Sequence, residues 1–192
     1  MLYQNTTIDT TKLIIGNCKI ETAVYGTSAA SATGWTNLGC GIVNEPTHNL
    51  VKFDTQCGNG PDPIEGIADE TFTVSGELIE FDASVLATIS CGALTSSAGS
   101  GSGQTIINAG GNTDLTARAF KITNRRLISG VTQSTVILLY KATIDNGLQF
   151  SLKSDNDTDP VSAMPFSITA KKDDTLTAGS QLYQVIHTYN PA

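Results

Sequence analysis

The feature that most constrains the fold of this chain is a close succession of short strand-like segments in its second half. Turn-forming residues separate most of these segments, which are rich in apolar and β-branched residues. In residues 147–154, Leu148, Phe150 and Leu152 alternate with polar residues, which predicts one buried and one solvated face. Such a series of short strands predicts an antiparallel β-sandwich or barrel. The five expected strands are residues 115–127, 134–144, 147–154, 161–171 and 181–189.

The first half of the chain continues this pattern with fewer and less regular strands. We expect strands at residues 12–25 and 71–81, and a short strand at 35–39 that ends on glycine. Residues 42–53 are weakly patterned and contain Pro46, which has no N–H group to donate to a sheet. This stretch is therefore expected to be an edge strand or a broken strand.

Two long loops and one helix complete the expected organisation. Residues 54–70 are dense in Gly, Pro and acidic side chains, and residues 94–114 contain a Gly/Ser-rich run. Between them, residues 82–90 have the pattern of a short helix that Asp82 caps at its N-terminus. This helix is expected to flank the sheet through an apolar stripe of Val85, Leu86 and Ile89.

Composition limits the class of protein. At 192 residues the chain suits one domain, residues 1–192, with a single core. No stretch approaches the ~20 apolar residues of a membrane-spanning helix, and the N-terminus resembles no secretory signal, so no membrane role is expected. The formal net charge of −7 argues against tight nucleic-acid binding through phosphates.

Candidate catalytic and metal-binding residues are few, and no cofactor is expected. Neither His48 nor His187 lies in a nucleophile or metal motif, although sequence order alone leaves a Ser-His-Asp site open. For His187 we expect a structural, hydrogen-bonded role. The four cysteines lack zinc-type spacing and are expected to be buried free thiols, with two disulfides as the alternative. The sequence therefore favours a protein that is not an enzyme.

The adjacent arginines Arg125 and Arg126 lie within an expected strand. Neighbouring strand residues point to opposite faces, so the two side chains are not suited to bind one anion together. We expect them to form an ion pair between subunits or to lie at a solvated edge.

The order of segments resembles the tail tube proteins, or major tail proteins, of tailed bacteriophages. The resemblance spans most of the chain in layout and character, without an invariant signature and without catalytic residues. The stretches that carry it are residues 16–26, 35–39, 70–80, 91–92, 140–143, 147–152, 159–160 and 164–170.

The resemblance implies an antiparallel sandwich or barrel with a flanking helix. It also implies that six copies close into a ring, that rings stack into a tube, and that viral DNA passes through without tight binding. The other expected partners are tail proteins: the terminator, the baseplate or tip, and a sheath where the tail is contractile. The expected location is the virion tail, after synthesis in the bacterial cytoplasm.

Two groups of residues are assigned roles on this basis. In residues 71–81, Phe72 and Val74 occupy one face of the strand. The opposite, polar face is expected to line the channel and contains Thr71, Thr73, Ser75 and Glu77. The acidic loop is expected to mediate ring stacking through Asp62, Glu65, Asp69 and Glu70.

Several other functions remain open from sequence. One is another phage structural component, such as a capsid decoration or tail-completion protein, and another is the tube of a secretion system. A carbohydrate-binding or adhesin module is favoured less, because aromatic residues make up only 6% of the chain and Trp35 is the single tryptophan.

Overall fold

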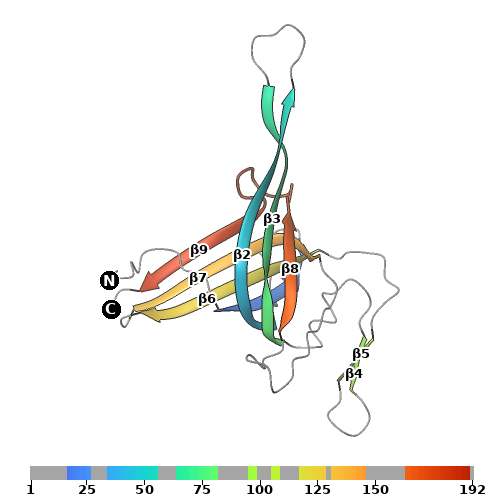
Figure 1. Cartoon of the computed structure of the whole chain (residues 1–192), viewed down its shortest axis with the longest axis vertical. Helices are drawn as coiled ribbons and strands as arrows, with labels where there is room; N and C mark the ends of the chain where they lie inside the picture. Colours follow the sequence, from blue (N-terminus) through green and yellow to red (C-terminus); the bar gives the residue numbers. More distant parts are fainter. Residues whose placement is uncertain are drawn as a thin grey trace, which may run out of the picture.

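The computed structural model of the protein (Figure 1) describes residues 17–26, 34–55, 64–81, 95–98, 105–108, 117–128, 131–145 and 163–190. Every strand pairing in these ranges is antiparallel. The strands are β1 (Asn17–Val24), β2 (Thr36–Thr55), β3 (Ile64–Phe81), β4 (Thr95–Ala98), β5 (Thr105–Asn108), β6 (Arg118–Ile128), β7 (Val131–Ile144), β8 (Met164–Lys171) and β9 (Tyr183–Asn190).

Six strands close into a barrel. They follow the order β6-β1-β2-β3-β8-β7, and the pairing of β7 with β6 closes the ring. The pairing of β7 with β8 is short, since only residues 142–144 of β7 take part in it. The earlier part of the same edge, residues 132–139, pairs with β9 instead. This antiparallel barrel confirms the mainly β architecture expected from the sequence.

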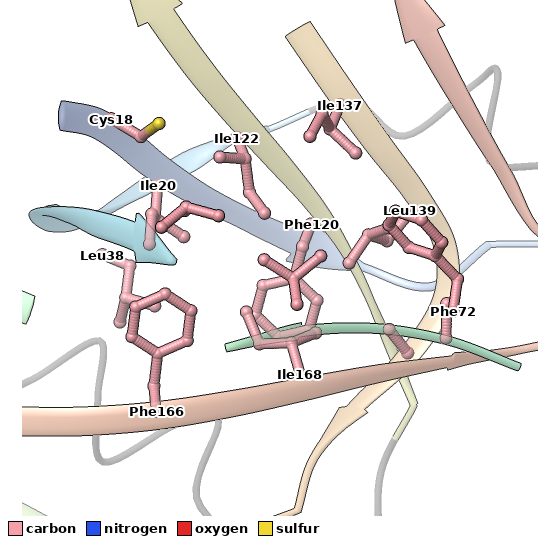
Figure 2. Close-up of a cluster of buried hydrophobic side chains, with 14 of the residues drawn as sticks. Cys18, Ile20, Leu38, Phe72, Phe120, Ile122, Ile137, Leu139, Phe166 and Ile168 are labelled. Atoms are coloured by element: carbon pink, nitrogen blue, oxygen red, sulfur yellow. The ribbon is translucent and has the colours of Figure 1, made fainter. Parts of the chain in front are cut away.

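The barrel interior is filled by apolar side chains that alternate along the strands. On β3, Phe72, Val74, Gly76 and Leu78 are buried, while Thr73, Ser75 and Glu77 between them face outward. Side chains from β1, β2, β6, β7 and β8 meet them, so the barrel encloses a packed core (Figure 2). The core of the described chain includes Cys18, Ile20, Leu38, Phe120, Ile122, Ile137, Leu139, Phe166 and Ile168.

β2 differs from the short strand and broken strand expected for residues 35–53. It runs as one strand of 20 residues and passes through Gly39, Gly41 and Pro46. Register shifts between β2 and β3 occur at three places: the extra residue lies on β2 at one of them, Asn44, and on β3 at the other two, Ile79 and Ala68. Beyond Ile42, β2 pairs only with β3 among the described residues, so Pro46 lies where β2 is an edge. The edge position predicted from Pro46 is therefore confirmed.

The two expected loops are shorter than the sequence suggested. β3 already begins at Ile64, so most of the described part of residues 54–70 continues the β2–β3 ladder. Along this ladder consecutive residues of both strands are exposed, namely residues 50–53 and 67–69. Within residues 94–114, β4 and β5 form a small two-stranded sheet. The helix expected at 82–90 and the strand expected at 147–154 lie outside the described residues.

The cysteines differ in their surroundings. Cys18 is buried in the core, as expected, whereas the thiol of Cys40 is exposed and corrects the expectation that it would be buried. Cys40 pairs with Lys19 on β1 and Glu80 on β3, which are exposed on the outer face of the barrel. Cys57 and Cys91 lie outside the described residues.

Candidate assembly surfaces

The expected channel residues lie together on the outside of the barrel. Thr71, Thr73 and Ser75 are half-buried and Glu77 is exposed, on the face of β3 opposite the core. The neighbouring strand β8 contributes Ser167 and Thr169 in register with Ser75 and Thr73. The hydroxyls of Thr73 and Thr169 lie 3.1 Å apart and share a hydrogen bond. This part of the barrel therefore presents a hydroxyl-rich surface with little net charge.

The β2–β3 hairpin extends far beyond the barrel as a two-stranded ribbon (Figure 1). We define the arm as residues 47–55 and 64–70, which pair with each other along this ribbon. Four large apolar side chains of the arm are between 43% and 55% exposed: Leu50, Val51, Phe53 and Ile67. Sequence analysis did not single them out, although apolar residues flanking an acidic Gly/Pro segment are a signal of an exposed hairpin.

The arm carries the residues expected to mediate stacking. Asp69 is exposed and Glu70 is half-buried at the base of the arm. The Asp69 Oδ1 atom accepts a hydrogen bond of 2.9 Å from the Glu70 backbone N–H. Glu65 belongs to the arm part of β3, and Asp62 lies outside the described residues.

A glycine shapes the arm. The ring of Phe53 lies over Gly66 on the paired strand, and a Cβ at Gly66 would come within 2.5 Å of ring atoms. Any larger residue at 66 would displace the ring. The aromatic side chain therefore covers the glycine backbone across the ribbon.

The outer edge of β9 is a second candidate surface. Among the described strands β9 pairs only with β7, so no described strand lies along its other edge. Val185 and Ile186 are each 40% exposed on this strand. Tyr183 fixes the start of β9, because its ring stacks on Phe72 at 4.0 Å and meets His48 edge-on at 5.6 Å.

A cavity of about 360 Å³ opens on the outer face where β6, β1, β2 and β3 adjoin. Its lining is mainly apolar, with charged groups from three strands. It brings together residues that are distant in sequence, so no local motif could have revealed it. The lining includes Asn17, Lys19, Cys40, Ile79, Glu80 and Arg125.

An ion-pair network lies near this cavity. The Glu21 carboxylate contacts Lys19 at 2.9 Å and Lys121 at 2.8 Å. Burial alone would raise the pKa of Glu21, but the two lysines outweigh that effect and hold its pKa below the usual value. Lys121 also lies 4.7 Å from the centre of the Trp35 ring, so this indole is part of a cation–π contact.

A buried carboxylate holds the connection between β8 and β9. Asp173 is 1% exposed, and its Oδ1 atom accepts hydrogen bonds from the Thr175 hydroxyl and backbone N–H. Burial alone would raise the pKa of Asp173, but Thr175, the nearby Tyr25 hydroxyl and Lys141 lower it below the usual value. The connection that follows β8 thus contains one buried charge.

The two histidines occupy structural positions. The Nδ1 atom of His187 lies 3.0 Å from the Thr135 hydroxyl on the paired strand, which confirms the expected hydrogen-bonded role. His48 is exposed at the base of the arm. The part of the chain that the structure describes contains no group of three or more His, Cys, Asp or Glu side chains suited to a metal ion. It also contains no helix long and apolar enough to cross a membrane.

Comparison with known proteins found similarities among solved structures. No protein-family model and no curated protein matches the chain. Among solved structures, the chain is similar to one described as "Crystal structure of Hcp protein", with 11% sequence identity and a TM-score of 0.38. The similarity covers 88% of this chain and 98% of that chain. Values this low do not assign a function.

Proposed function

We propose that this protein is a structural subunit, without catalytic activity, that self-associates into rings and that these rings stack into a tube. The observation that carries the proposal is the arm, which projects from a closed barrel with four large apolar side chains in water. Monomeric proteins rarely leave a long apolar ribbon with two free edges, because such a ribbon pairs readily with other chains.

The outer edge of β9 supports the same proposal. A neighbouring copy can add a strand there through backbone hydrogen bonds, which need no particular side chain. An edge and an arm on different parts of one subunit produce head-to-tail contacts, and head-to-tail contacts generate rings or filaments. The resemblance to tail tube proteins sets the expected number of copies at six per ring.

Within this class, we propose the tail tube of a bacteriophage as the specific role. The outer face with Thr71, Thr73, Ser75 and Glu77 supports this role, because it offers hydroxyls and a carboxylate to passing phosphates. These four residues include no cation to bind phosphates, and the carboxylate repels them at short range, so DNA would slide without binding tightly. The ring contacts would be formed by copies of this chain, and the tube would meet other tail proteins at its two ends.

The tube of a secretion system is the alternative, because the same edges and arm would build it equally well. A capsid decoration or tail-completion protein is a further alternative, and it would need few copies or isolated rings. An adhesin would need an exposed aromatic platform, whereas Trp35 is engaged by Lys121.

Electron microscopy of the purified full-length protein at increasing concentration tests the proposal. We expect rings with a central hole and, at higher concentration, stacked tubes. A particle that remains a single copy at every concentration would contradict self-assembly. Immunogold labelling of phage particles and of bacterial secretion preparations then separates the two tube readings, since only one of them should be labelled along its length.

A further inference from the structure

Charge is strongly segregated between two parts of the described fold. Residues 47–70, which contain the arm, carry five acidic residues and one lysine. β6 shows the opposite balance, with four cationic residues and no acidic one. The cations of β6 are Arg118, Lys121, Arg125 and Arg126. Opposite potentials on two surfaces of one chain favour contact between copies.

The cavity on the β6-β1-β2-β3 face matches the arm in shape and polarity. Its lining is mainly apolar, and Ile79 at its wall is 46% exposed. Arg125 and Lys19 supply positive charge there, and Glu80 supplies one negative charge. Lys19 is already paired with Glu21, whereas Arg125 is exposed and forms no ion pair with a described residue. The arm, with its exposed apolar side chains and the exposed carboxylate of Asp69, suits such a cavity.

The arm cannot reach this cavity within its own chain. Cys40 in the cavity and Val51 in the arm both belong to β2, eleven positions apart. At about 3.3 Å per residue, an extended strand separates these positions by roughly 36 Å. An occupant from the arm must therefore come from a second copy.

We propose that the arm of one copy docks on the cavity face of the next copy. Apolar side chains of the arm enter the cavity, and Asp69 approaches Arg125 of the neighbouring copy. The donor and acceptor surfaces differ, so the contact is head-to-tail and propagates from copy to copy. This inference rests on the proposed function and adds to it the surface that receives the arm.

A disulfide trap tests the contact directly. Val51→Cys is introduced into the full chain with Cys57→Ser and Cys91→Ser, so that Cys40 is the exposed native thiol. Disulfides require Cα atoms within about 7 Å, so a bond between positions 51 and 40 must join two copies. Mild oxidation should give a ladder of covalent multimers on non-reducing gels, and adding Cys40→Ser should abolish it.

The control for the trap is Val24→Cys in the same background, since Val24 is also apolar and exposed but lies at the end of β1, outside the arm, the cavity lining and the β9 edge. It should give no ladder that depends on Cys40. An equal ladder from the control, or none from Val51→Cys in assembled material, would overturn the docking contact.

A charge swap tests the pairing independently. Asp69→Lys and Arg125→Glu should each raise the protein concentration needed for assembly by about tenfold or more, because like charges then meet at the contact. The double variant should restore assembly. Asp174→Lys makes the same charge change at an exposed position outside the arm and should have little effect.

The outcomes separate this inference from the proposed function. Suppose that tubes form but Val51→Cys gives no disulfide with Cys40, and that Asp69→Lys with Arg125→Glu does not restore assembly. The docking contact would then be wrong, while self-assembly would stand. A wild-type protein that never assembles would overturn self-assembly itself, and the docking contact with it.

Discussion

Gly76 on β3 and Phe166 on β8 are register partners, and the Phe166 ring occupies the space beside the glycine α-carbon. A Cβ at residue 76 would lie 2.9 Å from two ring atoms and 2.1 Å from the Ile42 carbonyl oxygen. The backbone of β2 and the core therefore approach each other closely at this point. The glycine is needed for space, because its neighbours on both sides already fill the barrel.

Gly76→Ala should consequently destabilise the barrel. Overpacking of a closely packed interior typically costs about 1–3 kcal/mol, and here one of the clashing atoms is backbone, which cannot rotate away. Chemical denaturation followed by circular dichroism measures the change. Ser75→Ala, one residue away on the outer face, is the matched control and should change the free energy of unfolding by less than about 0.5 kcal/mol. Equal effects of the two variants would contradict this account of Gly76.

Asp173→Asn should lower stability in a pH-dependent way. Losing a charged acceptor for Thr175 should cost about 1–2 kcal/mol at pH 7. The pKa of Asp173 is depressed in the folded protein, so its contribution is fully present above the unfolded pKa of about 3.9. That contribution is lost as pH falls through the lower, folded pKa.

Chemical denaturation at pH 7 and at about pH 3 checks the direction of this pH dependence, since the unfolded-state pKa of Asp lies between the two. The stability difference between wild type and Asp173→Asn should narrow at the lower pH. Asp174→Asn changes the neighbouring, exposed carboxylate and should show no such convergence. A gap that widened on acidification would contradict a depressed pKa.

Shortening the arm should separate folding from assembly. Leu50 and Glu70 are register partners, so an Asn-Gly turn can replace residues 51–69 and close the hairpin there. The core lies in the barrel, so thermal unfolding of the variant should be little changed. Light scattering should show loss of rings and tubes. Full-length tubes formed by this variant would exclude an assembly role for the arm.

Glu77→Lys should leave assembly intact but slow the passage of DNA, if the tube belongs to a phage. Glu77 is exposed on the hydroxyl-rich face, and a lysine there would attract phosphates. The delay in genome ejection should shrink at high salt, because screening shortens the range of this attraction. Glu77→Gln is the control and should cause a smaller delay. Unchanged ejection kinetics with Lys would remove this face from the channel wall.

Expectations that depend on a single strand were met by the structure. Phe72 and Val74 lie inside the barrel and Thr71 and Thr73 lie outside, because alternation follows from the pleat of one strand. The edge position of Pro46 could also be predicted, since a missing N–H group is a local property. The length of β2 could not be predicted from its own residues, because the strand continues through register shifts in its pairing with β3.

Features that depend on which strand pairs with which could be determined only from the tertiary structure. Nothing in residues 54–70 alone shows that β3 begins at Ile64, because that extension is stabilised by pairing with β2. The exposure of Cys40 likewise depends on its neighbours Lys19 and Glu80 across two ladders.

The sequence by itself determined that this chain forms antiparallel strands, which side of residues 71–81 is buried, and where acidic and basic residues accumulate. These properties are local, since they depend on the alternation and charge of consecutive residues. Only the tertiary structure decided that six strands close into a barrel, that the arm projects beyond it, and that four strands build a cavity with Arg125 at its wall. Those features depend on register between distant segments, and register is set by the packing of the whole core.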